Sequence, residues 1–106
     1  MMENFRFFGA PHMALITAPG ELGPYAYLDC GGFITGFCLA AQSLGIGTIP
    51  QAAVAGCAPL LRDWFNLAED RTILIGIAFG RPDPDHPANT FRTARAPLAE
   101  WVTWRD

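Results

Sequence analysis

The residues best suited to hold a ligand lie in one uncharged stretch of the chain. From Cys30 to Leu61 there is no charged side chain and no histidine, and this stretch contains Gly45-Ile46-Gly47-Thr48-Ile49-Pro50-Gln51-Ala52-Ala53. The glycine-bounded turn brings backbone groups to one place, which suits a flat ligand lying against the main chain. By itself a Pro-Gln pair is usually only a turn, so other features must decide between the two interpretations.

Arginine supplies every basic side chain, because the chain has seven arginines and no lysine. Arg92 and Arg95 are three residues apart and flank Thr93. Guanidinium groups suit bidentate contacts to a phosphate or a carboxylate, although isolated surface arginines are usually only solvated. The arginines form no basic stripe and the net charge is −3, which argues against nucleic-acid binding.

Nucleophilic and metal-ligating side chains give weaker signals. Cys30, Cys38 and Cys57 are odd in number, form no Cys-x-x-Cys pair and lie in apolar surroundings. We therefore expect buried, reduced thiols of a cytoplasmic protein. His12 and His86 are isolated, and we expect each to be structural or solvent-exposed rather than catalytic. No cluster of His and Cys residues indicates a metal site, and none is expected.

Secretion and membrane insertion are not indicated by the sequence. The N-terminal residues lack the apolar core and the cleavage site of a signal peptide. The apolar run from Cys30 to Ala41 is too short to span a bilayer before Gln42 and Ser43 interrupt it. We therefore expect a cytoplasmic protein without membrane contact.

A chain of this size has difficulty burying its apolar side chains alone. It has 106 residues, of which 51% are hydrophobic and 16% are charged. This length suits one small domain over residues 1–106, and small domains bury a smaller share of their surface than large ones. We therefore expect a homodimer or a higher oligomer.

The spacing of apolar residues predicts three strands and two or three helices. The clearest strand is Thr72–Gly80, which is apolar on both faces and therefore typical of a central strand. The longest helix is Tyr25–Leu44, with Gly45 placed to end it. The other expected elements are a loop over residues 1–11, a strand over His12–Ala18, a short strand or extended turn over Gly47–Gln51, a helix opened by Ala58-Pro59, and an extended proline-rich arm over residues 81–106 with a short helix from Pro97.

The long helix is apolar on every side, so it is expected to lie between two layers or between subunits. Gly32, Gly36 and Ala40 are spaced four apart and would let a second helix approach closely. The elements together predict an α+β fold with an antiparallel-type sheet and a long apolar central helix. In the helix after Pro59, the expected inner face consists of Leu60, Leu61, Trp64 and Phe65, with Leu67 as a further candidate.

Several segments, taken in order along the chain, resemble the C-terminal half of the nitroreductase family of flavoproteins. The first is Asn4-Phe5-Arg6-Phe7-Phe8-Gly9-Ala10-Pro11 before a strand. The second is the long helix ending in the segment from Leu44 to Gln51, which resembles Leu-Gly-x-Gly-Thr-x-Pro-Gln. The third is the Arg-Thr-x-Arg-x-Pro tail from Arg92 to Pro97. Each motif is weak alone, and their common order makes the resemblance fairly specific.

The resemblance implies a homodimer with FMN bound at the subunit interface. In such a dimer the central helix would pack against its partner, and the arm over residues 81–106 would embrace the other subunit. Members of the family typically carry two electrons from NAD(P)H to nitroaromatic or quinone-like acceptors. Because the cofactor carries the chemistry in such enzymes, no catalytic side chain is expected.

The resemblance also assigns cofactor-binding residues. Pro50, Gln51, Ala52 and Ala53 match the loop that lies against the isoalloxazine ring, where a backbone N–H of Ala52 or Ala53 would approach flavin N5 or O4. Family members often have an acidic residue and a glycine at the last two positions, so the alanines keep only the backbone donors. Arg92 and Arg95 match the tail arginines that contact the FMN phosphate.

The chain has about half of the length that is usual in the family. The N-terminal half of the family pattern holds an arginine cluster that grips the phosphate, helices that cover the flavin, and at least one strand. We therefore expect a truncated or inactive fragment, or a half completed by another chain, with FMN affinity lowered by orders of magnitude. The alternative is a flavin-free dimerisation or interaction module derived from the family.

Overall fold

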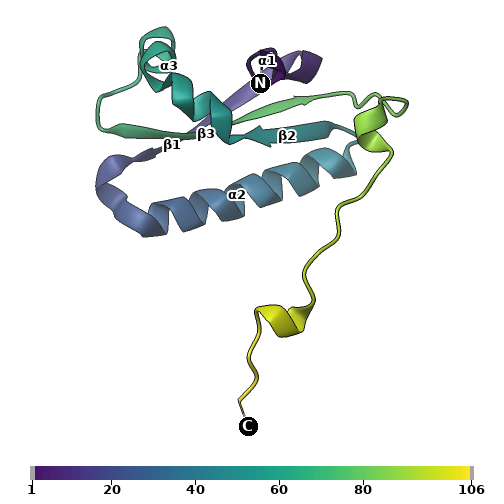
Figure 1. The fold of residues 1–106 in the computed structure, drawn as a ribbon. Helices are drawn as coiled ribbons and strands as arrows, with labels where there is room; N and C mark the ends of the chain where they lie inside the picture. Colours follow the sequence, from purple (N-terminus) through teal and green to yellow (C-terminus); the bar gives the residue numbers. More distant parts are fainter. Residues whose placement is uncertain (1, 106) are drawn as a thin grey trace.

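A three-stranded antiparallel sheet separates one long helix from a layer of short helical segments (Figure 1). The computed structural model describes residues 2–105. The strand order is β1-β3-β2, so that the last strand of the chain lies in the centre. This arrangement confirms the predicted α+β class with an antiparallel-type sheet. The strands are β1 (His12–Pro19), β2 (Gly47–Gln51) and β3 (Arg71–Gly80).

The central strand β3 contributes more buried core residues than any other element of the described chain. Ile73, Ile77 and Ala78 are buried, and Ile77 has no exposed surface. Its neighbours pair with it over most of their length, with His12 opposite Phe79 in β1 and Gln51 opposite Gly76 in β2. The predicted central strand is therefore confirmed, and it begins one residue earlier than expected.

The long helix α2 (Gly23–Ser43) confirms the predicted helix over Tyr25–Leu44 within two residues. It begins with a proline in its first turn, a position where the missing N–H costs nothing. It ends at Ser43, Leu44 is its C-cap, and Gly45 follows in the left-handed region with a φ of 71°. The N–H groups of Gly45 and Ile46 donate to the carbonyls of Gln42 and Ala41, which closes the last turn.

Only one face of α2 is covered by the described chain. Ala26 and Ala41 are buried against the sheet, whereas Leu28, Phe33 and Leu39 are exposed. A Cβ added at Gly32 or Gly36 would meet no atom within 4 Å, so the side that could admit a second helix is open. The helix thus has one apolar face on the sheet and a second one in solvent.

Among the described residues, no helix has the length and apolar character needed to cross a membrane.

The opposite face of the sheet carries four short segments. Val54 is buried there and lies over Gly76 of β3, where a Cβ would come within 3.1 Å of both Val54 methyl groups. The lead-in over residues 1–11, expected to be a loop, is partly helical, and this expectation was wrong. The four segments are α1 (Met2–Phe5), the 3₁₀ turn η1 (Phe7–Gly9), the 3₁₀ turn η3 (Ala52–Cys57) and α3 (Ala58–Phe65).

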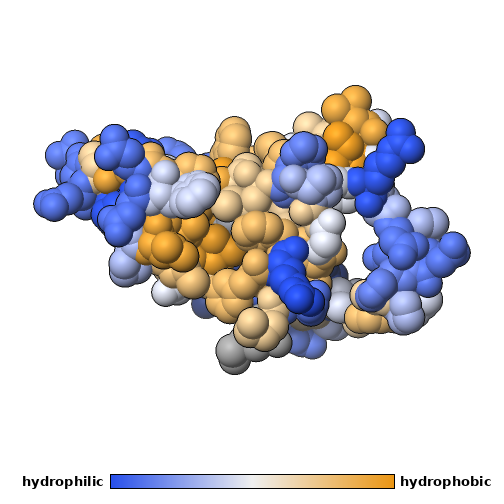
Figure 2. Space-filling model, turned by 90° about the horizontal axis from the view of Figure 1, so that it is seen from above, coloured by the Kyte–Doolittle hydropathy of each residue, from blue (hydrophilic) through white to orange (hydrophobic). Residues whose placement is uncertain are grey.

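The predicted inner face of α3 is not covered. Leu60 and Trp64 are 67% and 80% exposed, and Phe65 is also exposed. Leu61 is half-buried, and so is the further candidate Leu67, which lies beyond the end of α3. Seen from the side of α1 and α3, the molecule shows apolar surface across its middle (Figure 2). The amphipathic pattern therefore marks a face that no described segment of this chain covers, and the expectation of a buried face was wrong.

The residues after β3 form an exposed tail that leaves the sheet and runs away past α2 (Figure 1). It contains the single 3₁₀ turns η4 (Pro87–Asn89) and η5 (Leu98–Glu100). The predicted final helix from Pro97 is thus only one turn, because Leu98 and Trp101 are exposed and have nothing to pack against.

Replacing Gly76 by alanine is expected to lower the free energy of unfolding by about 1–3 kcal/mol, because the new Cβ would crowd the buried Val54 side chain. Urea unfolding of wild type, Gly76→Ala, Val54→Ala and the double variant measures the effect. The double variant should lose less stability than the sum of the single losses. Gly56→Ala is the control, since a Cβ there meets nothing within 4 Å. Additive losses in the double variant would show that the two residues are not coupled.

Candidate functional site

The loop at the end of β2 is held between two buried residues. Gln51 closes the strand opposite Gly76, and Val54 packs over the same glycine from the first turn of η3. Between these two anchors, Ala52 and Ala53 are exposed. The short loop is therefore fixed at both ends while its middle faces the surface.

The exposed part of this loop offers backbone donors. The N–H groups of Ala52 and Ala53 open a 3₁₀ turn and have no partner within it. No side chain caps this turn, and none of the other backbone hydrogen bonds among the described residues uses these groups. Two adjacent N–H groups are thus available to acceptor atoms of a ligand.

The side chain of Gln51 points into the protein. It is 3% exposed, and its Nε2 donates to the backbone carbonyl of Asn4 at 2.9 Å and to Asn4 Oδ1 at 3.2 Å. Its Oε1 is buried and has no hydrogen-bond partner among the described residues. Gln51 is one of the four predicted loop residues, but its side chain contacts α1 and not the open surface. No local pattern in the sequence indicates this inward direction.

The two tail arginines make only local, neutral contacts. Arg92 Nη1 donates to the carbonyls of Asn89 and Phe91 at 3.1 and 3.0 Å. Arg95 Nη1 donates to Thr93 Oγ1 at 2.6 Å. Neither arginine forms an ion pair within the described part of the chain, where the ion pair present joins Arg6 Nη1 and Glu3 Oε1 at 3.6 Å. Both tail guanidinium groups therefore keep an uncompensated positive charge.

The loop and the arginines are held by different parts of the molecule. The hydrogen-bond partners of Arg92 and Arg95 all belong to the tail, whereas the loop at 50–53 is anchored to β3 and α1. In Figure 1 the tail runs away from the layers that carry the loop. The described chain alone does not bring the two predicted groups into contact.

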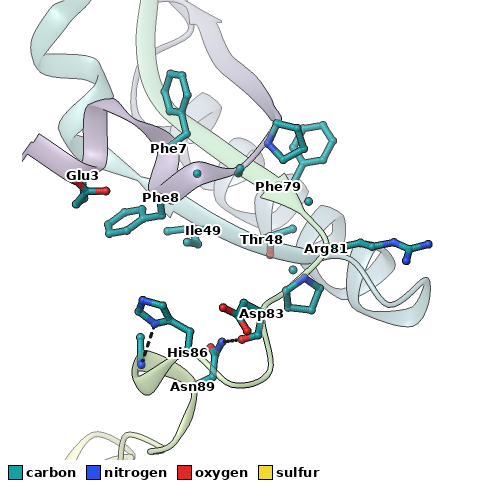
Figure 3. A pocket seen from close by; sticks show the side chains of 17 residues that line it. Glu3, Phe7, Phe8, Thr48, Ile49, Phe79, Arg81, Asp83, His86 and Asn89 are labelled. Carbon is teal, nitrogen blue, oxygen red and sulfur yellow. Dashed lines mark hydrogen bonds between the residues drawn. The ribbon is translucent and has the colours of Figure 1, made fainter.

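A cavity of about 690 Å³ lies at the other end of β2, and it contains none of the predicted site residues. Phe8 and Ile49 line one side, and His86 and Asn89 of the tail lie across from them (Figure 3). Phe7 and Phe8 both have left-handed backbone, with φ values of 54° and 52°, which is unusual for aromatic residues. Sequence patterns gave no sign of this cavity, because it depends on the path of the tail.

The remaining candidate side chains do not form a reactive cluster. In residues 2–105 no group of three or more His, Cys, Asp or Glu side chains is placed to hold a metal ion. Cys30, Cys38 and Cys57 are free thiols that are half-buried, rather than buried as expected. His86 Nδ1 accepts a hydrogen bond from the N–H of Ala88 at 3.1 Å and thereby caps η4.

Comparison with known proteins gives a consistent result. A model of the nitroreductase family matches residues 1–81. The chain is 35% identical to 4-nitrobenzoate reductase of Pseudomonas putida over 92 residues, which cover 87% of this chain and 40% of the relative. It is 36% identical to nitroreductase NfnB of Mycolicibacterium smegmatis over 98 residues, covering 92% of this chain and 42% of the relative. The chain thus spans less than half of the length of these relatives.

Solved structures show the same partial coverage. The FMN-dependent nitroreductase NfnB from Mycobacterium smegmatis, determined in complex with NADPH, superposes with a TM-score of 0.91 at 34% identity. It covers 98% of this chain, and the chain covers 46% of it. The FMN- and NADPH-dependent nitroreductase NfnB from "sphigopyxis sp. strain HMH" superposes with a TM-score of 0.95 at 28% identity, and 47% of its chain is covered. The fold described above is therefore nitroreductase-like.

Proposed function

Because this chain belongs to the nitroreductase family, we propose that it carries part of the flavin site of an FMN-dependent NAD(P)H oxidoreductase. The proposed reaction is the two-electron reduction of nitroaromatic or quinone-like acceptors. The names of the relatives support this class, since they include reductases of 4-nitrobenzoate, chloronitrobenzene and nitrobenzene. The observation that carries the proposal is the pair of exposed backbone donors at Ala52 and Ala53, held between two buried anchors.

The loop fits the edge of a flavin ring. Pro50, Ala52 and Ala53 present a small, uncharged surface to solvent, and the N–H groups of the alanines suit the N5 and O4 acceptors of an isoalloxazine. When bound, FMN would supply the two-electron chemistry. This chain's contribution would be to orient the ring and to place fixed N–H dipoles where negative charge accumulates on reduction.

The tail arginines fit a phosphate. Arg92 and Arg95 each use Nη1 for neutral contacts, and in each guanidinium Nη2 makes no hydrogen bond within residues 2–105. Guanidinium forks bind phosphate oxygens in pairs, and such charge-assisted bonds are stronger than neutral ones. We assign these two residues to the phosphate end of FMN.

A second chain is expected to complete the site. The open face of α2 exposes Leu28, Phe33 and Leu39, and the glycines on this helix leave room for close approach. We propose a homodimer across this face, with the tail lying on the other subunit and its Trp101 in contact there. A complementing chain with the remaining part of the family fold is the other way to cover these surfaces.

A flavin-free interaction module is the second candidate function. The exposed apolar residues of α2 and the exposed Trp101 and Trp104 of the tail favour it, because a dimerisation module needs these surfaces and needs no flavin loop. Size-exclusion chromatography with light scattering, run with and without FMN, separates the two candidates. A concentration-dependent dimer that never takes up FMN would support the module and contradict the flavin site.

Replacing Ala52 by proline is expected to weaken FMN binding about tenfold or more, because it removes one backbone donor. Proline fits here, since Gln51 is extended with φ −131° and ψ 95° and Ala52 is the first residue of a helical turn. Quenching of FMN fluorescence during titration with the protein measures the change. Ala52→Gly keeps the N–H group and is the control. Equal affinity of Ala52→Pro and wild type would exclude this donor.

Replacing Arg95 by alanine is expected to weaken FMN binding about 10- to 150-fold, which corresponds to the loss of one charge-assisted contact. Because the residue lies in an exposed tail, the melting temperature should not change. Arg105→Ala removes the same charge from the same tail and is expected to bind FMN like wild type. If both variants lose the same affinity, the effect comes from overall charge, and Arg95 has no specific role.

A further inference from the structure

Gln51 is a polar residue in the apolar interior. Burying its amide costs free energy, so its position needs an explanation. Among residues 2–105, Gln51 is the one polar or charged residue that is buried, with 3% of its surface exposed. A primary amide loses its hydrogen bonds to water on burial, and the loss is compensated only when partners are found in the protein. Its neighbours in sequence, Pro50 and Ala52, are both exposed. The amide is therefore buried at the point where the chain turns toward the surface.

The hydrogen bonds of this amide are directed to one place. Its Nε2 lies 2.9 Å from the backbone oxygen of Asn4 and 3.2 Å from Asn4 Oδ1. A backbone carbonyl can only accept, so the nitrogen and not the oxygen of the amide must face it. The orientation of Gln51 is thereby determined. Oε1 then points into buried space, and it has no partner within the described chain.

The contact connects two parts of the chain that are far apart in sequence. Asn4 belongs to α1 and precedes Gln51 by 47 residues in the chain. On its other side, residue 51 is paired with Gly76 of β3. The backbone at this position is thus fixed by the sheet from one direction and by α1 from the other. The next two residues carry the exposed N–H groups.

We propose that Gln51 is a positioning residue, which sets the direction of the Ala52 and Ala53 N–H groups by tying the loop to α1. This inference rests on the proposed flavin site and gives the side chain of Gln51 a role that needs no contact with the ligand. The residue would act through the backbone of its neighbours. If the role of Gln51 were purely structural, removing its amide would instead lower the stability of the fold.

Gln51→Leu separates the two roles, because leucine is of similar size and removes both polar atoms. Loss of the unpartnered Oε1 should leave the melting temperature unchanged or raise it. Loss of the bond to Asn4 should release the loop, so that the ¹⁵N order parameters of Ala52 and Ala53 fall from about 0.85 to below about 0.6 in the protein without FMN. FMN should then bind about tenfold or more weakly.

Gln42→Leu is the matched control, since Gln42 is the other glutamine of the chain and is exposed. It should change neither the order parameters of the loop nor the affinity for FMN. The proposal is overturned if Gln51→Leu keeps a rigid loop and wild-type affinity. It is also overturned if the variant loses affinity only in proportion to a loss of folded protein.

A second variant, Gln51→Glu, tests the donor directly through pH. An ionised glutamate would set a carboxylate oxygen against the carbonyl of Asn4, whereas a protonated one can donate its O–H group to it. Burial raises the pKa of such a carboxyl group, so recovery should begin above its ordinary value of about 4.3. Relative to wild type, Gln51→Glu should bind FMN weakly at pH 8 and recover as the pH falls toward 5. A pH-independent deficit would contradict the assignment.

The loop measurement keeps the two proposals distinguishable. The order parameters of Ala52 and Ala53 are measured without FMN, so they report on Gln51 even if no flavin binds. If wild type fails to bind FMN while Gln51→Leu still loosens the loop, the proposed function is wrong and the positioning of the loop by Gln51 stands. If FMN binds to wild type and to Gln51→Leu equally well, the positioning role is wrong and the proposed function stands.

Discussion

The close approach of η3 to the central strand is the contact on which the rest of this structure depends. At Gly76 the strand has no side chain, and the buried Val54 occupies the space that a Cβ would take. This contact holds η3 on the sheet, and the exposed residues Ala52 and Ala53 lie between it and the buried Gln51. The same strand pairs with both β1 and β2, so one element sets the register of the sheet and the position of the loop.

A large apolar surface remains exposed on the described chain. Packing against the sheet buries one side of α2, and the other side stays in water with large apolar residues such as Leu28 and Leu39. The uncovered face of α3 and the exposed tail add to this surface. Exposed apolar area of this extent is typical of an interface. Since the chain spans less than half of the length of its relatives, these surfaces agree with a fold that is finished by further protein.

The sequence predicted those features that depend on local patterns. The bounds of β2 agree with the prediction, and α2 and β3 differ from it by one or two residues, because periodicity and terminal glycines act locally. It failed where the outcome depends on distant contacts. The helical turns before Pro11, the exposed face of α3 and the inward direction of Gln51 depend on what the rest of the fold covers. The cavity beside Phe8 depends on the path of the tail, which carries no periodic signal.

A flavin bound against the loop at the end of β2 can be detected residue by residue by nuclear magnetic resonance. The measurement is a ¹H–¹⁵N spectrum of the labelled chain during titration with FMN. We expect the backbone amides of Ala52 and Ala53 to shift first and most, together with the side-chain resonances of Arg92 and Arg95. Shifts concentrated at Phe8 and His86, around the other cavity, would contradict it, and so would a spectrum that FMN leaves unchanged.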